Sequence, residues 1–143
     1  EKILKDEHDL IERIMETSPS GILRVNVDGL IIYANKRAEK ILGTRISETN
    51  PKTFNDPGWK ITNLSGGSYP ENALPFNRVK HTGAPVFDIQ HAIQWSDGTR
   101  ILLSVNASPI LNDSGGFDGI VASVEDITKR FISEQKYQML LMK

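Results

Sequence analysis

Imidazole and carboxylate groups are the side chains of this sequence that could carry acid–base or metal chemistry. The carboxylates of its central part are scattered among predicted turns and strands: Asp56, Glu71, Asp88 and Asp97. Their spacing pairs no two of them for general acid–base catalysis. Asp88 and His91 are three residues apart on a predicted strand, so they face opposite sides and cannot share a metal ion. We therefore expect neither a catalytic residue nor a metal site.

Motifs for covalent or nucleotide chemistry are missing as well. The sequence has no Gly-x-Ser-x-Gly elbow, no Walker loop, no His-Glu-x-x-His and no glycine-rich dinucleotide fingerprint between a strand and a helix. Its 143 residues include no cysteine, which excludes disulfides, thiolate metal sites and cysteine nucleophiles. The chain is therefore predicted not to be an enzyme.

The charge balance argues against large charged partners. Seventeen basic and 18 acidic residues give a net charge of -1, so we expect no nucleic-acid partner and no membrane contact. No apolar run approaches a membrane span and no signal peptide opens the chain, which favours the cytoplasm. The length suits one domain, and the start without Met suggests a piece of a longer protein.

The first part of the chain predicts a helix, a hairpin and a second helix. Residues 1–16 carry one apolar helical stripe opposite their charges, formed by Ile3, Leu10 and Ile14. Asp28 and Gly29 suit the positive φ angles of a tight hairpin between two short strands. Asn35 is suited to cap the helix that follows, which should end at Gly43.

The rest of the chain predicts loops, a short helix, three strands and a last helix. Residues 44–72 should form loops and short helical turns, and residues 75–82 a helix. Three strands connected by a turn and a loop follow: 85–95, 99–110 and 117–127. From residue 128 the pattern is helical again. Hairpin connections make the sheet largely antiparallel, with the helical middle over one face.

In this order and spacing, the chain resembles a PAS (Per-Arnt-Sim) domain over about residues 18–130. Three parts carry the resemblance: SPSGILRVNVDGLIIYANKRAEKILG, PFNRV with HTGAPV, and WSDGTRILLSVNASPILNDSGGFDGIVASVEDITKR. It implies an α+β fold with a five-stranded antiparallel sheet of order 2-1-5-4-3 and a pocket under the middle helices. On this basis we expect a linker helix, a PAS domain and a signalling helix over residues 1–17, 18–128 and 129–143.

The resemblance also implies a function. PAS domains sense small molecules, redox state or light and mediate dimerisation in histidine kinases, cyclic-dinucleotide enzymes and transcription regulators. We expect a sensory relay domain of a multidomain signal-transduction protein, with a histidine kinase of a two-component system as the leading parent. A small ligand would bind in the pocket. The alternative is a ligand-free module that dimerises and separates its neighbours.

In PAS domains the Asp-[Ile/Leu]-Thr motif closes the last strand and starts the helix that leads to the output domain. Asp126, Ile127 and Thr128 match it. Asp126 could accept hydrogen bonds or pair with an arginine, and Thr128 could cap the N–H groups of the outgoing helix. The motif would couple the pocket to the helix, or it would simply be a well-made junction.

The cofactor is unknown, but some PAS cofactors are disfavoured. Without cysteine there is no flavin–cysteinyl adduct and no thioester-linked chromophore. Heme would need an axial histidine near the start of the middle helix, where Ala73 or Leu74 stands, whereas His81 lies at its last turn. Non-covalent flavin stays open, with Asn106 and Trp59 as its hydrogen-bonding and aromatic contacts.

Candidate ligand-binding residues come from the loop-rich middle, the middle helix and two strands: Trp59, Phe76, Arg78, Val79, His91 and Asn106. Trp59 would stack on a planar ligand or pack as part of the lid. Arg78 would clamp an acidic ligand or form a surface ion pair. His91 would bond the ligand or be a satisfied structural residue, and Asn106 would be a pocket anchor or solvated.

The flanking helices predict a homodimer. The C-terminal helix has a stripe of Ile132, Gln135, Met139 and Met142 at coiled-coil spacing. Each flank has only about two heptads. This is fewer than the three or four heptads that indicate a coiled coil, so two alternatives stay open. The N-terminal stripe would contact a second copy of the chain, or it would cover the sheet face opposite the pocket.

Overall fold

The computed structural model describes the backbone of residues 2–142 and the side chains of residues 4–142, so the predicted contact of the Ile3 side chain lies outside the described residues. Its helices and strands follow one another as α1 (Lys2–Thr17), β1 (Gly21–Val25), β2 (Ile31–Ala34), α2 (Lys36–Leu42), η1 (Pro57–Trp59), η2 (Glu71–Ala73), α3 (Pro75–Thr82), β3 (Val86–Gln94), β4 (Arg100–Leu111), β5 (Phe117–Asp126) and α4 (Thr128–Leu141). η1 and η2 are single 3₁₀ turns. The predicted elements are confirmed.

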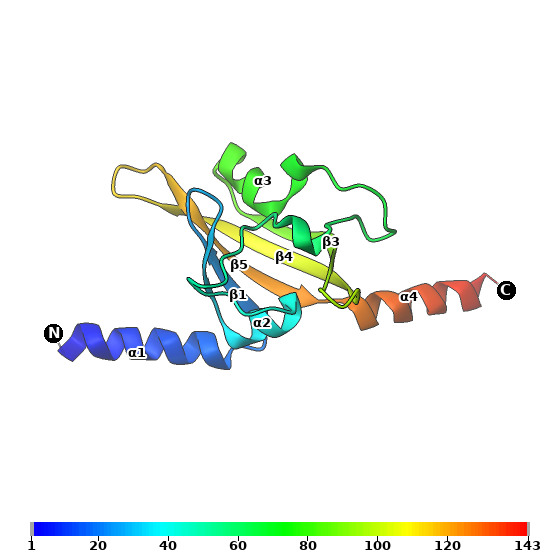
Figure 1. The fold of residues 1–143 in the computed structure, drawn as a ribbon, viewed down its shortest axis with the longest axis horizontal. Helices are drawn as coiled ribbons and strands as arrows, with labels where there is room; N and C mark the ends of the chain where they lie inside the picture. Colours follow the sequence, from blue (N-terminus) through cyan, green and yellow to red (C-terminus); the bar gives the residue numbers. More distant parts are fainter. Residues whose placement is uncertain (1, 143) are drawn as a thin grey trace.

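The five strands form one antiparallel sheet in the order β2-β1-β5-β4-β3, as predicted. α2, the loops around η1 and η2, and α3 cover one face of this sheet (Figure 1). The main core lies between these two layers, because side chains of α2 and α3 pack there against alternate residues of the strands.

Close contacts fix the position of α2 on the sheet. Asn35 caps α2, since its Oδ1 accepts the N–H of Ala38 at 2.9 Å. Gly21 lies directly beneath, where a Cβ atom would come within 2.8 Å of the Ala38 Cα and 2.6 Å of the Val124 Cγ2. Only glycine therefore allows α2 to approach β1 so closely.

The first hairpin is wider than the predicted tight turn. Of the two residues expected to adopt positive φ, only Gly29 does so, at 87°. Asn26 closes the loop, because its Oδ1 accepts the N–H groups of Asp28 and Leu30, each at 3.0 Å. The turn signal located the hairpin, and the asparagine before it set its width.

The opposite face of the sheet is not covered by α1. Leu10 and Ile14 of α1 are each 58% exposed, so the alternative that this stripe covers the sheet is wrong. α1 and α4 instead extend from the domain in opposite directions (Figure 1). On this face a small buried cluster forms at the root of α4 from Ala92, Leu102 and Ile127, with Leu64 and Phe131 against it.

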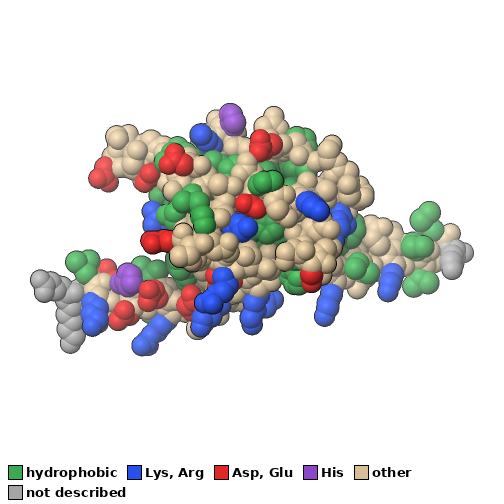
Figure 2. Space-filling view, viewed as in Figure 1, with side chains coloured by type: hydrophobic (Ala, Val, Ile, Leu, Met, Phe, Trp, Pro, Cys, Tyr) green, Lys and Arg blue, Asp and Glu red, His purple; other side chains and the backbone are tan. Residues whose placement is uncertain are grey.

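Apolar side chains are also exposed along α4. Met139, Leu140 and Leu141 are each more than half exposed, and hydrophobic side chains are visible near the outer end of this helix in Figure 2. Neither this helix nor any other described one has the length and apolar content that crossing a membrane would require.

Candidate functional site

A cavity of about 60 Å³ lies between the sheet and the segments that cover it. Side chains of β1, β2, β4 and β5 form its floor, and Phe54, Trp59 and the start of α3 form its roof. No charged residue lines it. The space is therefore suited to an uncharged and mostly apolar molecule.

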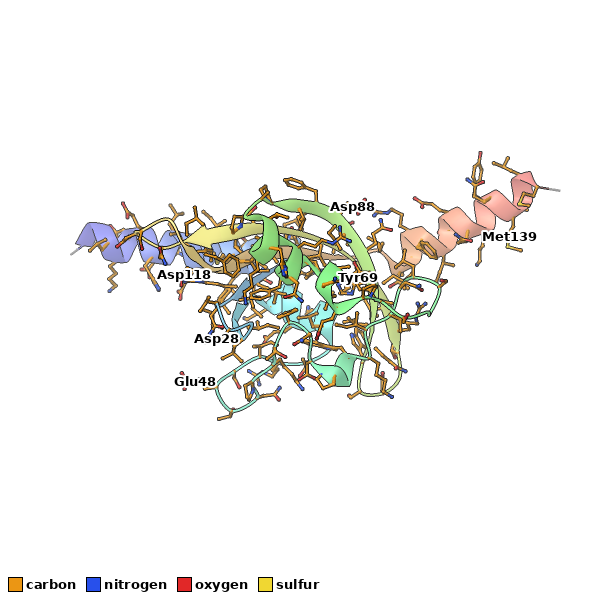
Figure 3. All side chains as sticks on the ribbon, turned by 90° about the horizontal axis from the view of Figure 1, so that it is seen from above. Asp28, Glu48, Tyr69, Asp88, Asp118 and Met139 are labelled. Carbon is orange, nitrogen blue, oxygen red and sulfur yellow. The ribbon has the colours of Figure 1, made fainter. Side chains whose placement is uncertain are left out.

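His91 of β3 is the polar exception in the cavity wall. Its side chain is buried, and its Nδ1 is the one buried side-chain nitrogen or oxygen, among the described residues, that lacks a hydrogen-bond partner. Burial lowers the pKa of the His91 imidazole to about 4, so the ring is neutral near pH 7. The ring of Tyr69, labelled in Figure 3, lies 5.5 Å away between centroids.

Aromatic rings close the roof of the cavity. Phe54 stacks on Phe76 with 4.4 Å between ring centroids, and Phe117 meets Phe76 edge-on at 5.7 Å. Trp59 is held in place because its Nε1–H donates to the Leu42 carbonyl oxygen at 3.1 Å. The roof is thus built from packed rings, and Phe54 among them lies on a loop, which a ligand could displace more readily than the strands below.

The loop that carries the roof is attached to the edge of the sheet. Thr62 exchanges two backbone hydrogen bonds with Ala92 of β3, at 2.8 and 3.1 Å. Arg100 of β4 reaches the same loop, where its Nη2 donates to the carbonyl oxygens of Asn63 and Leu64 at 2.8 and 2.7 Å. These contacts connect the roof to the edge strand β3 and to its neighbour β4. We did not expect a role for Arg100, because no local pattern in the sequence indicates it.

α4 is hydrogen-bonded to the sheet at its first residue. The Leu102 N–H of β4 donates to the Thr128 Oγ1 at 3.0 Å, and the Ile127 N–H donates to the Leu102 carbonyl oxygen at 2.8 Å. Asp126 Oδ1 accepts both the N–H and the hydroxyl of Thr128, at 2.9 and 2.6 Å. The root of α4 is therefore joined to β4 as well as to β5.

The structure differs from the predicted junction in the role of Thr128, whereas Asp126 accepts hydrogen bonds, which is one of the two roles expected for it. Thr128 does not cap the N–H groups of α4, because its hydroxyl is bonded to Leu102 and Asp126. The arginine nearest the junction, Arg130, pairs with Glu125 at 3.2 Å and not with Asp126. Asp126 thus holds the first residue of the helix, and Thr128 holds the neighbouring strand.

The cavity and the junction meet in two adjacent rows of the sheet. His91, Leu103 and Asp126 are direct cross-strand partners on β3, β4 and β5. In the next row Ala92 pairs with Leu102, which binds the root of α4. The strand position that pairs with His91, Leu103, is therefore next in sequence to Leu102, which is bonded to the root of α4.

Comparison with protein families decides the identity of the fold. The model of the PAS fold matches residues 9–127. The chain belongs to the PAS family. No curated protein matches the sequence.

Solved structures agree with this PAS fold at low sequence identity. An RNA-binding Light-Oxygen-Voltage receptor matches with a TM-score of 0.73 and 17% identity over 95% of this chain and 37% of that one. The PAS domain of an HTR-like protein from Haloarcula marismortui matches with 0.64 and 20% over 88% and 96%. A sensory box histidine kinase/response regulator from Burkholderia thailandensis E264 matches with 0.62 and 13% over 92% and 95%. At these identities the likeness concerns the fold alone.

Three of the predicted ligand-binding residues meet at the PAS cavity, namely Trp59, Phe76 and His91. Val79 is fully buried in the core but does not line the cavity. Arg78 points away, because Phe76 and Val79 occupy the sheet-facing side of α3; it is exposed, and its Nε donates to the Ala73 carbonyl oxygen at 2.6 Å.

Asn106 lies on the opposite face of the PAS sheet. It is exposed, and its Oδ1 accepts the Asp88 N–H at 2.8 Å. Strand alternation explains this position, since its neighbours Val105 and Ala107 are buried on the cavity side. Of the two roles considered for Asn106, the structure therefore supports the solvated residue and not the pocket anchor.

Large PAS cofactors do not fit this cavity as it stands. Its volume of about 60 Å³ is well below the roughly 300–1,000 Å³ of pockets for drug-sized ligands. Asn106 offers no hydrogen bond to a flavin from the outer face, and His81 is exposed, with its Nδ1 2.7 Å from the Asn77 carbonyl oxygen. The residues present thus match neither a flavin nor a heme.

The feature of the cavity that the sequence did not indicate is the partnership of Phe54 with Phe76. Phe54 lies in a loop without regular periodicity, where nothing in the local pattern distinguishes an inward ring from an outward one.

Away from the cavity, His8, Asp9 and Glu12 bring potential metal ligands within 4.8 Å of one another on α1, and all three are exposed. Such an arrangement is ordinary on a charged helix face.

Proposed function

We propose that this PAS domain is a ligand-responsive sensor of a longer signal-transduction protein. A small molecule binds in the cavity, and the change passes to α4 through Asp126, Ile127 and Thr128. A histidine kinase is the parent that we favour; a cyclic-dinucleotide enzyme or a transcription regulator is the alternative. The domain itself, over residues 18–128, is proposed to be non-catalytic, with helices on both sides as its connections.

The row that joins His91 to Asp126 through Leu103 is the observation that carries this proposal. Backbone hydrogen bonds make the strands of a sheet move together, so a ligand that moves the wall at β3 or β4 also moves the adjacent Leu102 position. Leu102 is bonded to Thr128 and Ile127, and the orientation of α4 follows. A coupling of about 1–3 kcal/mol between the two sites is enough for regulation.

Xenon provides a test that does not require the natural ligand, because it enters apolar cavities. Under xenon pressure, we expect the backbone amide resonances of the cavity wall, such as Leu103 and Val105, to shift. The amides of Thr128 and Phe131 should shift with them. Two-dimensional NMR of the 143-residue chain measures both groups in one experiment.

A matched pair of variants identifies the path. Thr128→Val removes the hydroxyl bonded to Leu102, whereas Thr128→Ser retains it. In T128V the cavity amides should still respond to xenon and the α4 amides should respond much less, while T128S should behave as the wild type. Cavity shifts without any α4 shift in the wild type would refute the coupling.

A ligand-free dimerisation and spacer module is the second candidate. It is favoured by the small cavity, whose roof is filled by the rings of Phe54 and Phe76, and by the exposed apolar residues of the flanking helices. Native mass spectrometry of the gently isolated chain distinguishes the two. A bound small molecule supports the sensor, and its absence together with a xenon response confined to the cavity supports the spacer.

A further inference from the structure

The cavity wall contains few polar side-chain groups, and they belong to His91 and Trp59. Every residue that lines the cavity is apolar or aromatic except His91. The indole N–H of Trp59 is already bonded to Leu42, so it is not available to a ligand. Nδ1 of His91 is left without a partner, and the residue as a whole is only 6% exposed.

A buried nitrogen without a partner is unfavourable, because it has lost its hydrogen bonds to water and gained none in return. Leucine has nearly the same volume and would pack in this apolar setting without that loss. The neighbouring inward residues of β3 and β4, Ile93 and Leu103, are indeed aliphatic. The histidine therefore indicates a polar partner inside the cavity.

We propose that the cavity binds a small uncharged molecule with one hydroxyl group, which hydrogen-bonds to Nδ1 of His91 while its apolar body contacts the surrounding rings and aliphatic side chains. This assignment rests on the proposed sensory function and specifies its ligand. A hydroxyl group both donates and accepts, so it satisfies Nδ1 in either tautomer of the neutral ring. A charged ligand would lose its hydration without meeting an opposite charge in the wall.

The volume limits the size of this molecule. One water needs roughly 10–15 Å³ of such space, and a cavity of about 150 Å³ holds benzene. The 60 Å³ found here lies between these values. The ligand should therefore have fewer heavy atoms than benzene, roughly three to five, unless Phe54 moves aside.

Propan-1-ol is a suitable probe, because it has one hydroxyl group and a three-carbon apolar body. Titrated into the 143-residue chain near pH 7, it should change the ¹⁵N resonance of His91 Nδ1 and the amides of the cavity wall. Binding should be about tenfold weaker in His91→Leu, in which the hydroxyl group is buried without a partner. His91→Asn keeps a polar atom close to the Nδ1 position and should retain most of the binding.

Three controls make the result specific. Xenon, which needs no polar partner, should bind the wild type and H91L alike. Propionate has a similar size and a negative charge, and it should not bind. His81→Leu removes an exposed histidine outside the cavity and should leave propan-1-ol binding unchanged.

The proposal is overturned if propan-1-ol binds H91L and the wild type equally, or if propionate binds as well as the alcohol. It is also overturned if the alcohol saturates the cavity amides without changing the His91 resonance, since water would then be the partner of Nδ1. If H91L does not fold, the wild-type ring resonance and the affinity of H91N decide the question.

The same titration separates this proposal from the sensory function. If propan-1-ol binds at His91 and the Thr128 and Phe131 amides do not shift, the ligand assignment stands and the coupling fails. If those amides respond to xenon but propan-1-ol binds the wild type and H91L equally, the coupling stands and the ligand assignment fails.

Discussion

Asn35 connects three segments of the chain through one buried amide group. Its Oδ1 accepts the N–H groups of Ile22 and Ala38, and its Nδ2 donates to the carbonyl oxygens of Met15 and Ser20. The cap on α2 was predictable, because an asparagine directly before a helix acts within three residues. The bonds to Ile22 and Met15 span 13 and 20 residues, and only the assembled fold brings these groups together.

His91 should make the stability of the protein depend on pH. Burial lowers its pKa from 6.5 to about 4, so below pH 6.5 the unfolded chain binds a proton that the folded chain does not. The stability contributed by the neutral ring is complete above the unfolded pKa and is lost as pH falls toward the folded one. Between about pH 7.5 and pH 5 the wild type should lose about 2 kcal/mol more than His91→Asn.

Urea unfolding of both proteins at the two pH values measures this difference. His81→Asn serves as the control, since it removes a histidine from an exposed position. Equal losses in wild type and H91N would show that His91 does not titrate as a buried neutral group.

At the scale of helices and strands, what could be predicted was local. Hairpin turns, caps and alternation located the elements, since these signals act over a few residues. Helical spacing on α3 already separates Arg78 from Phe76, and alternation on β4 already separates Asn106 from Val105. The pairing of Leu102 with Thr128 could not be predicted, because strand register across a sheet depends on distant residues.

Arg100 should control the opening of the roof at its attachment to β3. In Arg100→Gln, the carbonyl oxygens of Asn63 and Leu64 lose their charged donor. We expect the Thr62 and Ala92 amides, which bond to each other's carbonyl groups, to exchange with solvent about five to ten times faster. Hydrogen exchange followed by NMR measures this rate.

The matched control for Arg100 is Arg24→Gln, a change on an exposed position of β1. R24Q should leave both amides at the wild-type rate. If R100Q also leaves them unchanged, the roof is held by backbone pairing alone and Arg100 has no part in its opening.

For the molecule as a whole, the exposed apolar side chains of the flanking helices favour a homodimer. Leu10 and Ile14 on α1 remain uncovered by the domain. The same holds for Met139 on α4, which is labelled in Figure 3. Exposed apolar surface of this kind is commonly buried against a partner. A second copy of the chain is the partner that we expect.

Replacing Leu10 and Ile14 together by glutamine should weaken the dimer by tenfold or more, because it removes apolar area from the contact. The control replaces Glu12 and Arg13, which are on the same helix and also exposed, by glutamine. Sedimentation velocity over a range of concentrations measures both. A wild type that is monomeric at every concentration would contradict the prediction.

α4 is bonded to the sheet only near Thr128, so a change in its angle there moves its far end most. Its 14 residues at about 1.5 Å each give an arm of about 21 Å. A tilt of about 5° at Thr128 would move the far end by about 2 Å over that length. Under the proposed coupling, a small adjustment beside His91 that tilts α4 by this amount would displace Leu141 by about the size of a side-chain rearrangement.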